Sequence, residues 1–132
     1  MNIADIEKLE RVRTTDDIEA LPRDTEYVFT EGLNDSMIEA LLRLKRLKIL
    51  MNDGNSFVTD AGLKIVSAFQ SLKELDLEWS DNITDEGLIH LESLTQLEGL
   101  DIDFCHKTSR QGVLRLKEAL PNCEVTAERF NN

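Results

Sequence analysis

Leu72-Lys73-Glu74-Leu75-Asp76-Leu77 is a stretch that returns 25 residues later as Leu97-Glu98-Gly99-Leu100-Asp101-Ile102. Both copies place apolar residues at the first, fourth and sixth positions, and the last three positions alternate between apolar and polar. Alternation with a period of two is typical of a strand that buries one face. Weaker copies occur at residues 47–52 and 122–127. The repeat therefore predicts parallel strands that stack side by side.

A helix is predicted before each of these strands. Residues that can cap a helix recur at the same spacing, at Asn34, Thr59, Thr84 and Ser109. Their side chains can accept hydrogen bonds from the free N–H groups of a first helical turn. Apolar residues three apart follow each cap and give each helix one buried stripe. Each unit is thus one helix and one strand, and stacking the units places the sheet on one side and the helices on the other.

The segment Ile83-Thr84-Asp85-Glu86-Gly87-Leu88, together with the strand motif, resembles the leucine-rich-repeat family in its cysteine-containing and ribonuclease-inhibitor-like subclasses. The resemblance covers about residues 24–128. It implies an α/β solenoid, a right-handed horseshoe segment with a parallel sheet on its concave face and helices on its convex face. The buried ladder position of the family falls at Asn55, Ser80 and Cys105, which implies that Cys105 closes a buried turn by hydrogen bonding.

The chain of 132 residues is expected to form a single domain. Residues 1–23 are expected to form an N-terminal capping region, with a helix carrying Ile3, Ile6, Leu9 and Val12. Residues 24–132 hold the repeats and a C-terminal cap. The first strand is expected near Glu26 to Phe29.

The net charge of −11 excludes two classes of partner. A chain this negative repels phosphate backbones, so we expect it to bind neither nucleic acid nor an anionic membrane. The N-terminal residues 1–7 have neither the basic start nor the apolar stretch of a signal peptide, so a cytoplasmic location is expected. Cys105 and Cys123 are then expected to be reduced thiols.

Acidic residues concentrate at the strand positions predicted to face away from the helices. The fifteen positions are Asp24, Ile49, Glu74, Gly99, Glu124, Glu26, Met51, Asp76, Asp101, Thr126, Val28, Asp53, Glu78, Asp103 and Glu128. Ten are acidic and none is basic, whereas about three acids would follow from the 26 Asp and Glu among 132 residues. A charged face can serve solubility alone, but mixed signs would serve solubility equally well. We therefore interpret the face as a binding site for a basic protein.

Two aromatic residues lie one position beyond these columns. Trp79 is the single tryptophan of the chain, and Phe104 occupies the equivalent position of the next unit. Either both rings pack into the turns that close each unit, or they are exposed and supply an apolar anchor inside an acidic rim. The predicted partner-binding residues are Asp53, Glu74, Asp76, Glu78, Trp79, Asp101, Asp103, Phe104, Glu124 and Glu128.

No catalytic constellation is visible. A solvated sheet offers no cleft in which one carboxyl could be buried to act as an acid, and neither His90 nor His106 has a second ligand at metal spacing. The acids near Asp76 and Asp101 could attract Ca²⁺ weakly, but an ordered site needs about six to eight oxygen ligands. We expect no enzymatic activity, no metal site and no cofactor.

The resemblance suggests three functions. Because the family includes ribonuclease inhibitor, the chain is expected to be an inhibitor or an immunity or antitoxin protein whose partner is a basic toxin or nuclease. A ubiquitin-ligase-type substrate adaptor and an assembly factor of a larger complex are the alternatives. For an inhibitor or an adaptor, replacing Asp76 and Asp101 by Lys should abolish binding of the partner and leave the fold intact, since the side chains are expected to be solvated.

Overall fold

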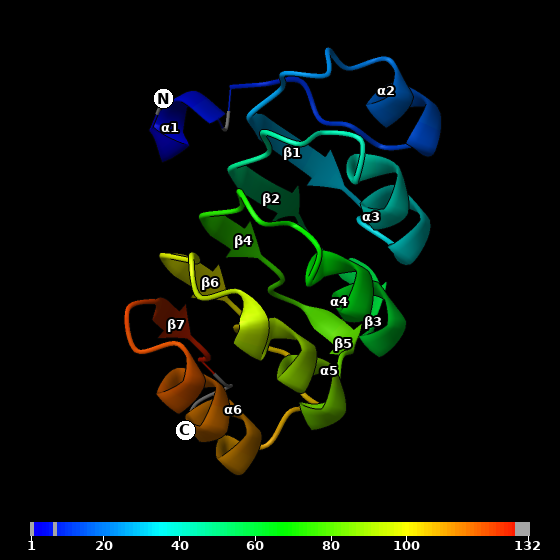
Figure 1. Cartoon of the computed structure of the whole chain (residues 1–132). Coiled ribbons are helices and arrows are strands. Elements are labelled where there is room, and N and C mark those ends of the chain that lie inside the picture. Colours follow the sequence, from blue (N-terminus) through cyan, green and yellow to red (C-terminus); the bar gives the residue numbers. More distant parts are fainter. Residues whose placement is uncertain (1, 7, 129–132) are drawn as a thin grey trace.

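A computed structural model describes residues 2–6 and 8–128, which form a mixed α/β structure with a parallel sheet. The five strands of the sheet, in spatial order, are β1 (Tyr27–Glu31), β2 (Ile49–Asp53), β4 (Glu74–Asp76), β6 (Gly99–Asp101) and β7 (Glu124–Thr126). The helices are α1 (Ile3–Ile6), α2 (Thr15–Glu19), α3 (Asp35–Leu41), α4 (Asp60–Val66), α5 (Asp85–His90), η1 (Leu91–Ser93) and α6 (Arg110–Ala119). Helices α2 to α6 lie in a row beside the sheet (Figure 1). A second, two-stranded sheet pairs β3 (Ser56–Thr59) with β5 (Ser80–Asn82).

Strands β2, β4, β6 and β7 pair at the 25-residue spacing that the sequence predicts. Glu74 of β4 lies beside Gly99 of β6, and Gly99 lies beside Glu124 of β7. The alternate residues Leu50, Leu75, Leu100 and Val125 are buried beneath the sheet. One face of each strand therefore covers the apolar core, and the other face points away from it.

The four predicted capping residues all occupy the N-cap positions of their helices. Asn34 accepts a hydrogen bond from the N–H of Met37, Thr59 from that of Ala61, and Ser109 from that of Gly112. Thr84 makes no such bond, although it occupies the same place at the start of α5. The helix starts were thus predicted correctly from one column of residue types.

Successive helices are joined by a repeated contact between an aspartate and the next N-cap. Asp60, the first residue of α4, accepts hydrogen bonds from the backbone N–H of Thr84 at 2.8 Å and from its hydroxyl at 2.6 Å. Asp35 binds Thr59 in the same way, and Asp85 binds Ser109. The acids also lie at helix N-termini, where the helix dipole stabilises negative charge.

Each joint needs a glycine in the following helix. A Cβ on Gly87 would lie 2.1 Å from Oδ1 of Asp60, and Gly62 and Gly112 are in the same position relative to Asp35 and Asp85. No side chain fits at that distance. The glycine column of the sequence thus reflects the close approach of a carboxylate from the preceding helix.

The buried ladder begins at a residue that the sequence pattern did not indicate. Ser80 and Cys105 are buried as expected, and both donate hydrogen bonds to the carbonyl of Leu77, at 2.7 and 3.2 Å. Asn55, however, is exposed, and the assignment of the first ladder position to it is wrong. Strand pairing places the buried Ser56 beside Ser80 instead. The nearby Asn52 is also buried, and its side-chain carbonyl oxygen accepts hydrogen bonds from the N–H of Leu33 and the hydroxyl of Thr30.

Replacing Asn52 by Ala should lower the free energy of unfolding by about 2 kcal/mol, because the N–H of Leu33 would lose its partner in the interior. Asn55→Ala is the matched control, and its exposed side chain should change the free energy by less than about 0.5 kcal/mol. Urea denaturation of both variants measures the difference. Equal effects would contradict the buried hydrogen bond between Leu33 and Asn52.

The N-terminal region differs from the expected capping helix. Helix α1 covers only Ile3–Ile6, whereas Val12 forms a parallel bridge with Thr30 and extends the backbone hydrogen bonding of β1. The expected helix through Val12 is therefore wrong. Residues 129–132 of the expected C-terminal cap lie outside the described residues.

The first strand is also displaced. Strand β1 pairs Tyr27 with Ile49 and Glu31 with Asp53, a spacing of 22 residues, because the first unit is three residues shorter than the others. Tyr27, Phe29 and Glu31 therefore occupy the positions that the sequence analysis gave to Asp24, Glu26 and Val28. Of these three only Glu31 is acidic.

Candidate functional site

The sheet face opposite the core carries most of the predicted partner-binding residues. We call this surface the acidic face and define it by the carboxylates of Glu31, Asp53, Glu74, Asp76, Glu78, Asp101, Asp103, Glu124 and Glu128. Strand pairing places Asp76 beside Asp101, and Glu31 beside Asp53. Backbone hydrogen bonds from Trp79 to Asp103 and from Phe104 to Glu128 continue the same order past the ends of the strands. The alternating sequence pattern thus brings acids from five consecutive units to one surface.

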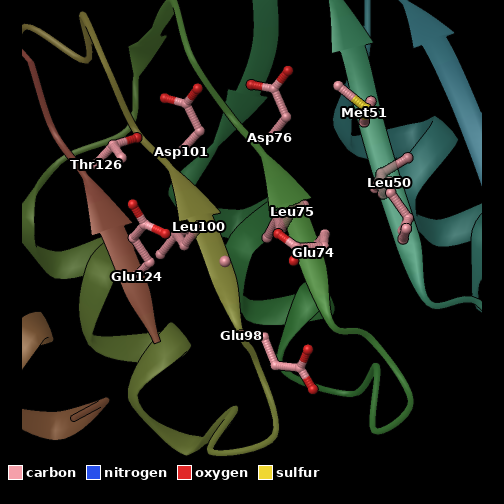
Figure 2. A pocket seen from close by; sticks show the side chains of 12 residues that line it. Leu50, Met51, Glu74, Leu75, Asp76, Glu98, Leu100, Asp101, Glu124 and Thr126 are labelled. Atoms are coloured by element: carbon pink, nitrogen blue, oxygen red, sulfur yellow. The ribbon is translucent and has the colours of Figure 1, made fainter. Parts of the chain in front are cut away.

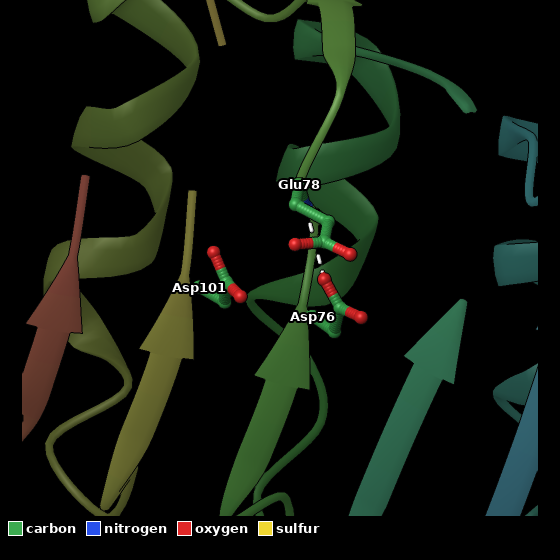
Figure 3. A group of neighbouring side chains, drawn as sticks. All are labelled: Asp76, Glu78 and Asp101. Carbon is green, nitrogen blue, oxygen red and sulfur yellow. Dashed lines mark hydrogen bonds between the residues drawn. The ribbon is translucent and has the colours of Figure 1, made fainter. Parts of the chain in front are cut away.

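Three carboxylates gather at the centre of the acidic face. One oxygen from each of Asp76, Glu78 and Asp101 lies within 4.8 Å of the others (Figure 3). Asp76 also accepts a hydrogen bond at 3.0 Å from the backbone N–H of Glu78, and Asp101 accepts one from Asp103 at 2.9 Å. These bonds between residues two apart are Asx turns, and they fix the direction in which each chain leaves its strand.

The central carboxylates are less solvated than the sequence analysis expected. Burial raises the pKa of Asp76 to about 6, and the neighbouring charges of Asp101 and Asp103 add to the effect against the backbone bonds that lower it. Burial and the charges of Asp76 and Asp101 raise the pKa of Glu78 to about 7. The expectation that these side chains are fully solvated is therefore wrong, and since Asp76 and Asp101 also accept hydrogen bonds from backbone N–H groups, we expect Lys at both positions to disturb the turns after β4 and β6.

A shallow, open depression of about 280 Å³ lies beside this cluster. Its floor includes Leu75 and Leu100, and its rim carries Glu98 and Glu124 (Figure 2). Gly99 creates the space, since a Cβ there would lie 1.9 Å from the carboxylate of Glu74. Burial and the charges of Glu98 and Glu124 raise the pKa of Glu74. The hollow is therefore apolar at its base and negatively charged around its edge.

Two arginines from the N-terminal segment neutralise one end of the acidic face. Arg11 forms an ion pair with Asp53 at 3.4 Å, and Arg13 pairs with Glu31 at 2.9 Å. The guanidinium of Arg11 also lies 4.0 Å above the centre of the Phe29 ring, which is a cation–π contact. The sequence analysis missed both arginines. Their spacing on either side of Val12 was the available signal, since it directs both side chains to one face of an extended segment.

The other carboxylates of the face have no such partner in the described part of the chain. Within residues 2–6 and 8–128, no Lys or Arg pairs with Glu74, Asp76, Glu78, Asp101, Asp103 or Glu124. Lys48 and Lys73 pair instead with Glu26 and Glu98, outside the acidic face. Negative charge therefore accumulates over β4, β6 and β7.

Trp79 and Phe104 are half-buried and stack on each other. Their ring centroids lie 4.4 Å apart, with an angle of 22° between the planes. Both have positive φ angles, of 61° and 59°, a conformation that costs a residue other than glycine about 1 kcal/mol. The two preceding units have Gly32 and Gly54 at this place, with φ angles of 70° and 76°. The rings thus stack on each other in the turns that follow β4 and β6, and half-burial leaves part of each ring exposed.

The arrangement offers limited chemistry of its own. The three central carboxylates could each give one oxygen to a hard cation, fewer than the six to eight that Ca²⁺ takes. Cys105 is buried and Cys123 half-buried, both are free, and burial raises the pKa of each thiol to about 11, so both are protonated near neutral pH. The Nδ1 atom of His106 lies 3.2 Å from a carboxylate oxygen of Asp81, and the imidazole ring packs edge-on against the ring of Trp79.

Fold and site together define a mixed α/β protein with a parallel sheet that presents an acidic face. No protein-family model and no curated protein matches the chain. The structure is similar to the tropomodulin C-terminal domain of Caenorhabditis elegans, with a TM-score of 0.55 and 17% identity, covering 87% of this chain and 84% of that chain. At this identity the similarity concerns the fold alone, which loosely fits the leucine-rich-repeat type.

Within the described residues, no helix has the length and apolar character required to cross a bilayer.

Proposed function

We propose that the chain is a leucine-rich-repeat solenoid of the cysteine-containing or ribonuclease-inhibitor-like kind. The 25-residue pairing of β4, β6 and β7 supports this proposal, as does the column of N-cap residues. The buried thiol of Cys105, which hydrogen-bonds to the carbonyl of Leu77, occupies the ladder position implied by the resemblance.

We further propose that the chain is a non-enzymatic module that binds a basic protein through the acidic face. The observation that carries this proposal is the accumulation of carboxylates over β4, β6 and β7 without a pairing Lys or Arg in the described part of the chain. Like charges this close repel one another, and this repulsion adds to the burial that raises the pKa values of Asp76 and Glu78. A partner that brings positive charge would relieve the repulsion, and the field of the face would steer its approach.

An inhibitory or immunity-type role follows by analogy with ribonuclease inhibitor, which the sequence resemblance introduced. Covering the active site of a basic enzyme requires a broad surface, and the acidic face extends across five units of the structure. The depression at Gly99 is open, which suits contact with a protuberance of another protein better than the enclosure of a small substrate. The cytoplasmic location belongs to the same proposal.

Removing two charges from the face should weaken binding. Pancreatic ribonuclease and egg-white lysozyme serve as basic probes, and calorimetry at low and at physiological salt measures their affinity. Asp76→Asn with Asp101→Asn should reduce the affinity about tenfold and reduce its dependence on salt. Asparagine can still accept the backbone hydrogen bonds of the two Asx turns, so the fold should be retained.

The matched control removes two charges elsewhere. Glu86 and Glu118 are exposed on α5 and α6, and Glu86→Gln with Glu118→Gln gives the same net charge as the first variant. This control should bind the probes nearly as well as the unmodified chain. An equal loss in both variants, or no binding to either probe at low salt, would contradict the proposed function.

A further inference from the structure

The depression at Gly99 is bounded by apolar as well as acidic groups. Ile49 and Met51 of β2, both half-buried, line one side of it, and Leu75 and Leu100 contribute to its floor (Figure 2). Its volume is about 280 Å³, and it opens to solvent on the face opposite the core. Covering apolar surface of this kind is favourable in water. The depression therefore suits an apolar group that comes from another molecule.

A missing side chain creates this hollow. Strand pairing places Ile49, Glu74, Gly99 and Glu124 in one row across four strands, and Gly99 alone has no side chain. The backbone of Gly99 is that of an ordinary strand, outside the positive-φ region that favours glycine. The glycine is therefore explained by the space above it, into which the carboxylate of Glu74 leans.

The acids beside Gly99 select a cationic occupant by charge complementarity. Glu74 and Glu124 flank Gly99 on the two neighbouring strands, so their backbones are two strand spacings, or about 10 Å, apart. In the part of the chain that the structure describes, no Lys or Arg pairs with either acid. Lys73 pairs with Glu98 at the rim, at 3.8 Å, and does not line the depression. A suitable occupant thus combines an apolar part with a positive charge.

We propose that the depression receives a lysine side chain of the partner protein, with its aliphatic stem against Ile49 and Met51 and its ammonium group at Glu74 and Glu124. This inference rests on the proposed function, and it names one side chain through which the basic partner is bound. Lysine carries a compact ammonium group at the end of four methylenes, and such stems pack along apolar surface while the charge stays near solvent. Arginine has a shorter apolar stem and a broad planar head, which fits the hollow less well.

Shortening the stem of a cationic peptide tests the apolar contact. One probe is a peptide of alternating Lys and Ala. The other has 2,4-diaminobutyrate in place of each Lys, which keeps the charge and removes two methylenes from each side chain. NMR titration at low salt measures both affinities and follows the amide signal of Gly99. The Lys peptide should bind about tenfold more tightly, because each methylene that is covered contributes a factor of about three to four.

Filling the depression should remove this preference without altering the charge of the face. Gly99→Leu places a side chain where β2 carries Ile49, and its Cβ meets only the flexible end of Glu74, which can rotate aside. In this variant the two peptides should bind with equal affinity. Leu114→Ala changes an exposed residue of α6 and is the control, which should keep the tenfold ratio. Circular dichroism and urea denaturation verify that each variant is folded.

Two further variants test the walls of the site separately. Met51→Ala removes part of the apolar wall and should reduce the ratio between the peptides to about threefold. Glu124→Gln removes one of the acids and should weaken binding of the Lys peptide about fivefold. Glu118→Gln, at an exposed acid of α6, is the matched control for charge and should bind the Lys peptide nearly as well as the unmodified chain.

The outcomes separate this inference from the function on which it rests. Equal affinity of the two peptides for the unmodified chain would overturn the lysine site and leave a face that binds basic proteins by charge alone. A tenfold ratio that persists in folded Gly99→Leu and Met51→Ala would overturn it as well. Failure of every cationic probe at low salt would overturn the proposed function itself.

Discussion

Gly87→Ala is expected to lower the free energy of unfolding by about 3 kcal/mol, measured by urea denaturation. The new Cβ would lie 2.1 Å from Oδ1 of Asp60, so the carboxylate has to move. Movement breaks its two hydrogen bonds to Thr84, at 2.8 and 2.6 Å, and Leu63 restricts the space on the other side at 3.1 Å. Bonds to a charged group contribute about 1.5 to 3 kcal/mol each, which outweighs the gain of about 1 kcal/mol from alanine in a helix.

A double-mutant cycle isolates the carboxylate. In an Asp60→Ala background the same glycine substitution should cost little, because the group it displaces is gone. Gly32→Ala is a second control, since nothing lies within 4 Å of its Cβ and only the φ of 70° opposes the change, at about 1 kcal/mol. A cost for Gly87→Ala that is the same with and without Asp60 would show that this joint does not exist in solution.

Between about pH 7.5 and about pH 5, the stability of the free protein should rise by about 2 kcal/mol while its affinity for a cationic peptide falls about tenfold. Asp76 and Glu78 have pKa values raised to about 6 and about 7 in the folded chain, from ordinary values of 3.8 and 4.5. In this pH range the folded state therefore binds more protons than the unfolded state, so lowering the pH favours folding. Asp76 contributes most of this gain in stability, because solvent screens the charge of the more exposed Glu78.

Binding should respond in the opposite direction because a protonated cluster no longer attracts cations. Urea denaturation gives the pH profile of stability, and calorimetry with a Lys-rich or an Arg-rich peptide gives the pH profile of affinity. Lys and Arg side chains do not titrate in this range, so the charge of the peptide stays constant. Asp76→Asn with Asp101→Asn should flatten both. If stability and affinity changed in the same direction with pH, or if the double variant left both profiles unchanged, the cluster of Asp76, Glu78 and Asp101 would control neither property.

Much of the sheet and helix arrangement could be predicted because the units repeat. Asn34, Thr59, Thr84 and Ser109 mark the starts of α3, α4, α5 and α6, and the alternation at Leu75 and Leu100 sets the buried face of the sheet. The first unit broke the pattern. It is three residues shorter, so a fixed period gave the wrong alignment for β1, and a separate register shift between β3 and β5 places Ser56 instead of Asn55 beside Ser80.

The alternation of apolar and polar residues along the strands predicts only part of the candidate site. Period two placed Glu74, Asp76 and Asp101 on one face, but it carries no information about depth, so the burial that raises the pKa of Asp76 was missed. The contact of Arg11 with Asp53 spans 42 residues, and no local pattern predicts such a pair. The Asx turns at Asp76 and Asp101 could have been suspected from an Asp at the last position of a strand that leads into a turn.

Each of Asp35, Asp60 and Asp85 binds the N-cap residue of the next helix, so this connection passes from one unit to its neighbour. The three joints use the same atoms at the same spacing, so one unit is interchangeable with another as far as its joints are concerned. Duplication of residues 60–84 would supply both halves of a new joint at once. A longer protein could therefore arise from this chain by tandem duplication, with no compensating substitution at the joint where the two copies meet.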